Sequence, residues 1–465
     1  MNLLRISCFA SLGMLVSVAS SGARAQEAAS PLTLAAVVDD AAKNYPAIHI
    51  SQEELNASVA RIHLARTAYL PRLDATAQFN RGTRNNVFGS LLPQSIIPPM
   101  SGPVIGTNNG GSVWGSAAGV LINWQPFDFG TRSANVHAAE AARDRAAAAN
   151  LRTQLEVETA SADAYLSVLA SMQAMKAAQT AVENWETLRQ SIHALAAAEL
   201  RPGADESRVN AEKAAAANQL ALAQQAVDTS VATLHKFQSA PVASVTPQAK
   251  LLSSVPTANG AENPLAVAEN PLMAERKAAT AENAAQLHAI ERSWAPQFNL
   301  EGAAYGRGTG AETDGRRLTG TNGLAPNIGN YVAGVNITFP VLDFASMHAK
   351  AAAQSATLRA ARANEDLTAR NLQEQFAQAQ AELRASETIA QNTPTQLEAA
   401  QTALNQATAR YKAGLVPVDD VAQAQRLQVQ AEIDNAIARL NVWRAFLKLQ
   451  YLRGDLQPFL QEANR

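Results

Sequence analysis

The sequence predicts an α+β membrane protein built from two copies of one structural unit. Three observations support this prediction: a set of motifs that occurs twice, four segments in which apolar and polar residues alternate, and two very long stretches almost free of helix breakers. Alternation with a period of two is typical of strands, whereas helices much longer than three or four turns are uncommon in globular domains. We therefore expect strands and a long helical hairpin in each half of the chain.

The duplication is clearest at four prolines. Pro46 and Pro71 flank a charged, alanine-rich segment in the first half of the chain. Pro271 and Pro296 flank a similar segment in the second half, and both lie 225 residues further on (271 − 46 and 296 − 71). Later motifs repeat at an offset of 215 residues (343 − 128), pairing Asp128 with Asp343, Pro202 with Pro417, and Asp205 with Asp420. Because this repeat is too long for a solenoid unit, it indicates a duplicated half-protein, as in channels and transporters.

The first 25 residues have the pattern of a secretory signal peptide. Arg5 supplies the positive charge, residues 8–18 form a short apolar stretch, and Ala23-Arg24-Ala25 is a small-residue cleavage site. The alternative is an N-terminal anchor helix, for which the apolar stretch is short. We therefore expect a signal peptide at 1–25, a first repeat at 26–240, a linker at 241–264 and a second repeat with a C-terminal tail at 265–465.

Composition excludes several classes of partner. Without residues 1–25 the chain has 36 basic residues (38 − 2) and 40 acidic ones, so its charge gives no reason to expect nucleic acid as a partner. The only cysteine, Cys8, lies in the signal peptide, so the remaining chain is expected to have no disulfide and no thiolate metal site. It also has no run of 18 apolar residues, so a membrane crossing would have to use strands.

Four segments have the alternation expected of strands that cross a membrane, and their length of about ten residues fits that interpretation. These segments are 72–80, 117–124, 297–305 and 331–339. In the last one, Val335, Ile337 and Phe339 alternate with Asn336 and Thr338, so we expect the apolar set to face lipid and the polar set to face a lumen. An ordinary half-buried sheet would also alternate, but aromatic residues near the strand ends favour the membrane interpretation.

The remaining sequence predicts two long helical hairpins. Residues 131–201 contain no glycine or proline, and residues 345–413 contain only Pro394. About 70 helical residues would extend on the order of 100 Å. A turn rich in proline and glycine follows each stretch, and a returning helix is expected to start near Asp205 and Asp420, since acidic residues in a first turn favour a helix start.

No pattern in the sequence indicates catalysis or a bound cofactor. The seven histidines are scattered without metal-ligand spacing, and no nucleophile lies near a plausible base. Acids such as Asp205 and Asp420 are expected to cap helices rather than act as paired catalytic carboxylates. We therefore predict no catalytic, cofactor-binding or metal site, and a protein that is not an enzyme.

These motifs, taken in order, resemble the TolC-like outer-membrane efflux proteins, or outer membrane factors. Two further segments carry the resemblance: Ala-Asp-Ala-Tyr-Leu-Ser-Val-Leu at 162–169 and Arg-Tyr-Lys-Ala-Gly-Leu-Val-Pro-Val-Asp-Asp-Val at 410–421. The resemblance extends over nearly all of the chain after the signal peptide. It implies a homotrimer in the outer-membrane lipid: a trimeric 12-stranded β-barrel with four strands per chain, continued through the periplasm by a long α-helical barrel. Four strands cannot close a barrel around a conduit, and an eight-stranded interior is filled by side chains, so oligomerisation is needed on physical grounds as well.

The resemblance also implies roles for the hairpin tips, which would dock a periplasmic adaptor (membrane fusion protein) and close the duct. The docking residues would be Leu200, Arg201, Pro202, Gly203, Gly414, Leu415, Val416 and Pro417. The gate candidates are Tyr411, Asp205 and Asp420, with Arg201 as a possible substitute for a gate arginine that the family can have at the position of Val416.

The function expected from the resemblance is a passive outer-membrane exit duct for a tripartite efflux pump or a type I secretion system, working with an inner-membrane pump. The alternative is a periplasmic coiled-coil adaptor or structural spacer, which would also have long hairpins. The four alternating strands, which connect directly to the helices, favour the duct.

Overall fold

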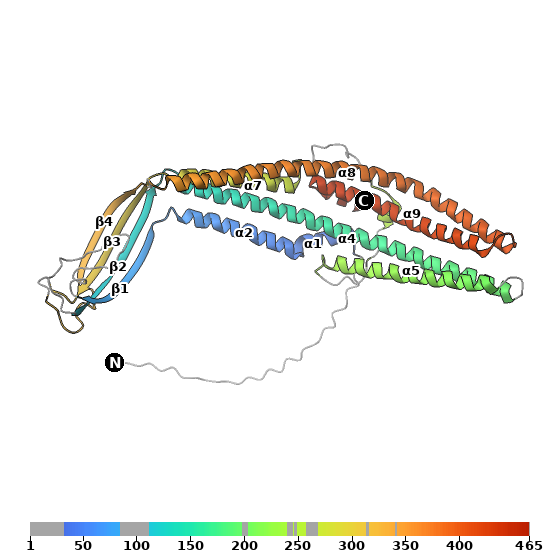
Figure 1. The fold of residues 1–465 in the computed structure, drawn as a ribbon, viewed down its shortest axis with the longest axis horizontal. Coiled ribbons are helices and arrows are strands. Elements are labelled where there is room, and N and C mark those ends of the chain that lie inside the picture. The colour runs from blue at the N-terminus through green and yellow to red at the C-terminus, as the bar shows by residue number, and fades with distance from the viewer. Residues whose placement is uncertain are drawn as a thin grey trace, which may run out of the picture.

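The structure is a computed structural model that describes residues 32–83, 111–197, 203–239, 245, 249–256, 268–312, 316–339 and 342–464. The molecule is elongated, with one sheet at one end and helices that run away from it to the tips of two hairpins (Figure 1). The expected signal peptide lies outside the described residues, as does most of the expected linker.

The same order of elements occurs twice. The first half contains α1 (Leu34–Asn44), α2 (Pro46–Thr67), β1 (Arg72–Thr83), β2 (Ser112–Phe127), α4 (Thr131–Ala197) and α5 (Gly203–His235). The second half contains α6 (Ala249–Ser253), α7 (Pro271–Arg292), β3 (Gln297–Thr309), β4 (Ile328–Thr338), α8 (Phe344–Lys412), α9 (Val418–Arg453) and α10 (Gln457–Asn464). Both α2 and α7 begin with a proline at their first position, where a missing N–H costs nothing.

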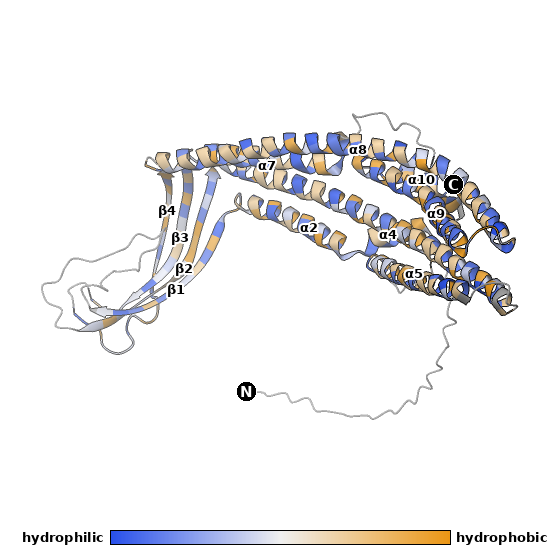
Figure 2. Cartoon of the chain, turned by 45° about the vertical axis from the view of Figure 1, so that its right-hand side comes forward, coloured by the Kyte–Doolittle hydropathy of each residue, from blue (hydrophilic) through white to orange (hydrophobic). Residues whose placement is uncertain are grey.

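The strands form one antiparallel sheet in the order β1-β2-β3-β4. In the first half Arg72 lies opposite Asn123, and in the second half Gln297 lies opposite Thr338. These pairs are related by the sequence offsets of 225 and 215 residues, so the duplication extends to the strand register. The two halves join where β2 pairs with β3, which leaves β1 and β4 as the edges of the sheet. Apolar and polar bands alternate along β1 (Figure 2).

The main core lies where the helices of both halves meet, midway along the molecule. Leu34 of α1, Tyr165 of α4, Trp443 of α9 and Phe459 of α10 are all fully buried there. The indole N–H of Trp443 donates to the carbonyl of Ser254 at 3.0 Å, which satisfies its one polar group. Burial of each such side chain is worth about 1.5–3 kcal/mol, so this region anchors both hairpins.

The long helices have the expected dimensions. α4 has 67 residues and α8 has 69, so each extends on the order of 100 Å. α8 contains Pro394, which removes one helical hydrogen bond, and the helix is curved (Figure 1). Among the described residues, no helix combines the length and the apolar character that a membrane crossing requires.

Part of the expected linker is ordered against the core. Residues 249–256 are described, and α6 lies within them. The side chain of Leu251 is fully buried in the main core, and Lys250 donates to the carbonyl of Glu462 at 2.5 Å. This segment therefore ties the connection between the halves to the C-terminal helix α10.

Candidate functional site at the hairpin tips

The tip of the second hairpin is a compact turn between α8 and α9. Gly414 has a φ of 79°, a left-handed conformation that favours glycine. The amide of Leu415 donates to the carbonyl of Arg410 at 2.9 Å, and that of Gly414 donates to the carbonyl of Tyr411 at 3.0 Å. This pair of hydrogen bonds is a Schellman motif, which closes the end of α8 before Pro417 starts the returning helix.

An apolar cluster holds the two hairpins together just above their tips. Tyr411 is 1% exposed and Ile192 is fully buried, so side chains from both hairpins exclude water here. The other buried members are Trp185, Val209, Leu404, Val418, Val421 and Ala422. We call this set the tip cluster.

A hydrogen bond crosses between the hairpins at this cluster. The hydroxyl of Tyr411 at the end of α8 donates to Oδ2 of Asp205 in the first turn of α5, at 3.0 Å. A buried tyrosine hydroxyl needs a hydrogen-bond partner, so the bond accounts for a polar group inside an otherwise apolar cluster. The carboxylate also lies where the dipole of α5 favours negative charge.

Two ion pairs continue this link along α5. Arg208 binds Asp419 with an Nε–Oδ1 distance of 2.5 Å, and Arg426 binds Glu212. Asp205, Arg208 and Glu212 are spaced by three and four residues, so they lie on one face of α5 and all reach the second hairpin. Exposed pairs of this kind are each worth about 0–1 kcal/mol, so they set the alignment of the hairpins more than their stability.

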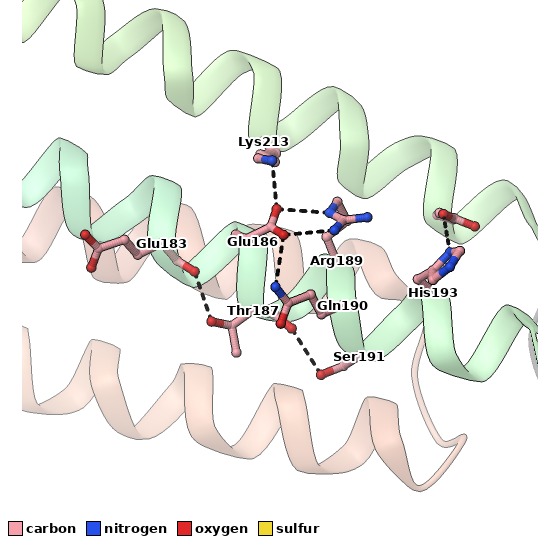
Figure 3. A network of polar contacts seen from close by, with 9 residues as sticks. Glu183, Glu186, Thr187, Arg189, Gln190, Ser191, His193 and Lys213 are labelled. Atoms are coloured by element: carbon pink, nitrogen blue, oxygen red, sulfur yellow. Dashed lines mark hydrogen bonds and ion pairs between the residues drawn. The ribbon is translucent and has the colours of Figure 1, made fainter.

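A second polar network joins the two helices of the first hairpin (Figure 3). Glu186 of α4 accepts hydrogen bonds from Arg189, at 2.8 and 2.9 Å, and forms an ion pair with Lys213 of α5 at 2.7 Å. Hydrogen bonds from Arg189, and then from Lys213, hold the pKa of Glu186 well below its ordinary value of 4.5. Nearer the tip, Nδ1 of His193 lies 2.8 Å from Oε1 of Glu206.

The structure brings together some of the expected gate residues and separates others. Tyr411 and Asp205 are in contact, whereas Asp420 is exposed in the first turn of α9. The expectation that Asp420 caps α9 is wrong, because the N-cap position is Pro417 and no side chain caps this helix end. Proline at the cap fixes the start of the helix two residues earlier.

The expected docking residues are only partly described. Leu200, Arg201 and Pro202 lie outside the described residues. Leu415 is 71% exposed at the extreme tip of the second hairpin. Among the described residues, no group of three or more histidine, cysteine, aspartate or glutamate side chains could hold a metal ion.

Sequence reasoning missed the ion pairs Arg208–Asp419 and Arg426–Glu212. A signal was present, since Asp205, Arg208 and Glu212 share one face of a helix. The partners on α9 could not be identified without knowing how the two hairpins pack.

The comparison with protein families decides the identity of this architecture. The family model for outer membrane efflux proteins matches residues 37–237 and 264–455. The chain belongs to the outer membrane efflux protein family. The match in two segments follows the two halves of the structure, and the predicted resemblance is confirmed.

Solved outer-membrane channels have the same fold. The outer-membrane channel OprN is 18% identical, with a TM-score of 0.74 over 90% of this chain and 89% of its own. CusC is 12% identical, with a TM-score of 0.76 over 91% of this chain and 92% of its own. The CmeC outer membrane channel of Campylobacter jejuni is 14% identical, with a TM-score of 0.73 over 97% and 94%. No curated protein sequence gives a significant match.

Membership of the outer membrane efflux protein family confirms the predicted fold class and location. The protein is an outer-membrane component of efflux, and its helical part extends into the periplasm. The expected exit duct is supported, whereas nothing in the comparisons supports a periplasmic adaptor.

Proposed function

We propose that three copies of this chain form a passive exit duct, with the sheets closing one barrel in the outer membrane and the hairpins forming a tunnel below it. The observation that carries this proposal is a four-stranded sheet with two unpaired edges, continuous with helices about 100 Å long. A barrel of eight strands has an interior filled by side chains, so a conduit needs more. Three copies would supply twelve strands (3 × 4).

The hairpin tips are the proposed gate and docking surface. The hydrogen bond from Tyr411 to Asp205 and the ion pair Arg208–Asp419 hold the second hairpin against the first. If the hairpins move apart when the duct opens, these links must break. A periplasmic adaptor would dock on the tip residues Gly414, Leu415, Val416 and Pro417 and on Leu200, Arg201, Pro202 and Gly203, and would connect the duct to an inner-membrane pump.

The proposed mechanism requires no catalysis. Energy would come from the inner-membrane pump, and the duct would only conduct. The ion pairs Arg208–Asp419 and Arg426–Glu212 near the tips have geometries that suit alignment, and the buried ion pair Asp128–Arg132 lies at the opposite end of the helices. We therefore propose that the protein is not an enzyme.

Cell fractionation and electrical recording test the proposal together. The protein should be found in the outer membrane and migrate as a species larger than one chain in unheated gels. In a planar bilayer it should conduct ions. Tyr411→Phe should increase the time-averaged conductance, because the hydrogen bond to Asp205 that holds the hairpins together is lost. A protein recovered as a soluble periplasmic species with no conductance would favour the adaptor and would overturn the duct.

A further inference from the structure

The internal duplication makes it possible to derive contacts between chains from contacts within one chain. The proposed trimer contains six half-units in a ring. Three of the six joints lie within chains, where the structure of one chain shows their geometry, and three lie between chains. Because the two half-units are duplicates, the simplest closed ring repeats one head-to-tail joint six times, with the joints between chains equivalent to those within them. The joint between β2 and β3, with its helices α4 and α7, is therefore a template for the joint between β4 and α8 of one chain and β1 and α2 of the next.

The equivalence of residues in the two halves is well defined by the sheet. The pair Arg72–Asn123 becomes the pair Gln297–Thr338 when 225 is added to the first number and 215 to the second. Both hairpins of strands obey these two offsets without exception along their registers. We therefore convert residues of β2 and α4 by adding 215, and residues of β3 and α7 by subtracting 225.

The template predicts the register between chains. Val120 lies opposite Ala304 in the joint within the chain, which converts to Val335 opposite Phe79 of the neighbouring chain. In the same way, Leu121 opposite Ala303 converts to Asn336 opposite Gln78. In the first of these pairs two apolar residues meet, and in the second two polar ones meet. A slip by one residue would place Val335 opposite a polar side chain.

The helical part of the template is a seam of ion pairs between α4 and α7. Arg152 binds Glu275 at 2.7 Å, and Arg145 binds Glu282 at 3.1 Å. The two pairs are seven residues apart on each helix, so they lie on one stripe of an antiparallel seam.

The equivalent stripe between chains is apolar. Arg152 and Glu275 convert to Leu367 and Ile50, and Arg145 and Glu282 convert to Ala360 and Ala57. One further step of seven residues pairs Ala353 with Leu64. In the single chain, Leu367 is 53% exposed, Ile50 is 61% exposed and Leu64 is 69% exposed, and the three alanines are exposed as well.

We propose that Ile50, Ala57 and Leu64 of one chain pack against Leu367, Ala360 and Ala353 of the next, forming an apolar seam where the equivalent seam within the chain uses ion pairs. The occupant of both stripes is a second copy of this chain. Two large residues, Ile50 and Leu367, meet at one end of the seam, two alanines meet at its centre, and Leu64 meets an alanine at the other end. The inference rests on the proposed trimer and specifies which residues hold it together.

Paired cysteines test the seam directly in a Cys8→Ser background, in which the engineered thiols are the only ones. Ile50→Cys with Leu367→Cys, and Ala57→Cys with Ala360→Cys, should each be joined between chains by a short bismaleimide, giving dimer and trimer bands. The crossed pairs, Ile50→Cys with Ala360→Cys and Ala57→Cys with Leu367→Cys, are displaced by about 10 Å along the axis and should react much less. Arg145→Cys with Glu282→Cys is the matched control, because it should be joined within one chain.

The outcomes separate this inference from the proposed function. If the native mass shows three chains but the crossed pairs react as well as the matched pairs, the seam is wrong and the duct stands. If the native mass shows a single chain in the outer membrane, the proposed trimer fails and the seam fails with it.

A charge-swap series provides a second test that does not depend on reactive cysteines. Leu367→Arg alone should lower the fraction of trimer in unheated gels at least several-fold. Adding Ile50→Glu should restore most of it, because the pair then reproduces Arg152–Glu275. Ala57→Glu should rescue Leu367→Arg much less than Ile50→Glu does. If Ala57→Glu rescues it as well as or better than Ile50→Glu, the register is wrong.

Discussion

The two junctions between strand and long helix are equivalent in sequence position but differ in how they are held. In the first half, Oδ2 of Asp128 accepts from the backbone N–H of Arg132 at 2.6 Å and from its Nε at 2.9 Å. Both side chains are about nine-tenths buried. Arg132 also donates to the carbonyl of Ala68 at 3.2 Å and lies over the ring of Tyr69 at 4.6 Å. One arginine thus connects the end of β2, the start of α4 and the end of α2.

The second half lacks this connection. The residue equivalent to Arg132 is Met347, whose side chain has no donor, and the side chain of Asp343 makes no capping hydrogen bond to α8. Trp294, equivalent to Tyr69, is 62% exposed, and an open pocket lies among Trp294, Phe344 and Lys350. The two halves therefore share their backbone and strand register but differ at this junction. The contacts of Arg132 with Asp128, Ala68 and Tyr69, which we call the polar lock, are found at the first junction, and the equivalent residues of the second junction do not form them. We expect the first junction to be rigid and the second to adapt more easily to a neighbouring chain.

The largest effect is expected from Arg132→Met, which makes the first junction like the second. It leaves the Asp128 carboxylate buried without its partner, and removal of one member of a buried pair costs about 3–5 kcal/mol. The measurement is the free energy of unfolding in denaturant, with Met347→Leu as the control, for which a volume-conserving change costs below about 1.5 kcal/mol. Equal losses from the two variants would show that the junctions do not differ.

A smaller effect is expected at β4, an edge strand of the second half. Val335→Arg should destabilise assembly by about 2–4 kcal/mol if its side chain faces lipid. Asn336→Arg on the other face should leave assembly intact and alter conductance instead. The fraction of trimer in unheated gels and the bilayer conductance check this. Similar assembly defects in both variants would contradict the assignment of faces.

The two halves also differ at the hairpin tips, at the other end of the molecule. Asp205 is bound by Tyr411, whereas the residue equivalent to Tyr411 in the first half is Ala196, so the duplication supplies no tyrosine for Asp420. Charges that line a narrow mouth set its ion selectivity. Asp420→Asn should therefore reduce cation selectivity more than Asp205→Asn, as measured by the reversal potential in a salt gradient. Unchanged reversal potentials in both variants would remove these acids from the gate.

The smallest effect concerns pH. Burial raises the pKa of Asp128, but the hydrogen bonds from Arg132 and Gly130 outweigh it, so the pKa lies below its ordinary value of 3.8. A lowered pKa means that this stabilisation is complete above the unfolded value and is lost as the pH falls through the folded one. The stabilisation that Asp128 contributes should therefore stay constant between pH 7 and 5, and the wild type should lose its advantage over Asp128→Asn only below about pH 4. A difference that disappears near pH 6 would contradict the lock.

The backbone of this protein follows from sequence patterns, because period-two alternation, unbroken helical stretches and repeated prolines are each local signals. The lock at Arg132 was also accessible, since Asp128 and Arg132 are four residues apart at the start of a helix, yet its contact with Tyr69 depends on how α2 returns beside β2. The link between Tyr411 and Asp205 joins residues 206 apart in the chain. The resemblance to the family predicted Tyr411 and Asp205 as gate residues. The pair Arg208–Asp419 could be identified only from the packing of the two hairpins.

The mass of the conducting species tests the central claim most directly. Protein extracted from the outer membrane should be measured by native mass spectrometry, and the same fraction should be recorded in a planar bilayer. We expect ion conductance in the species of three chains and in no smaller one. Conductance carried by a single chain, or a stable three-chain species that does not conduct, would contradict it.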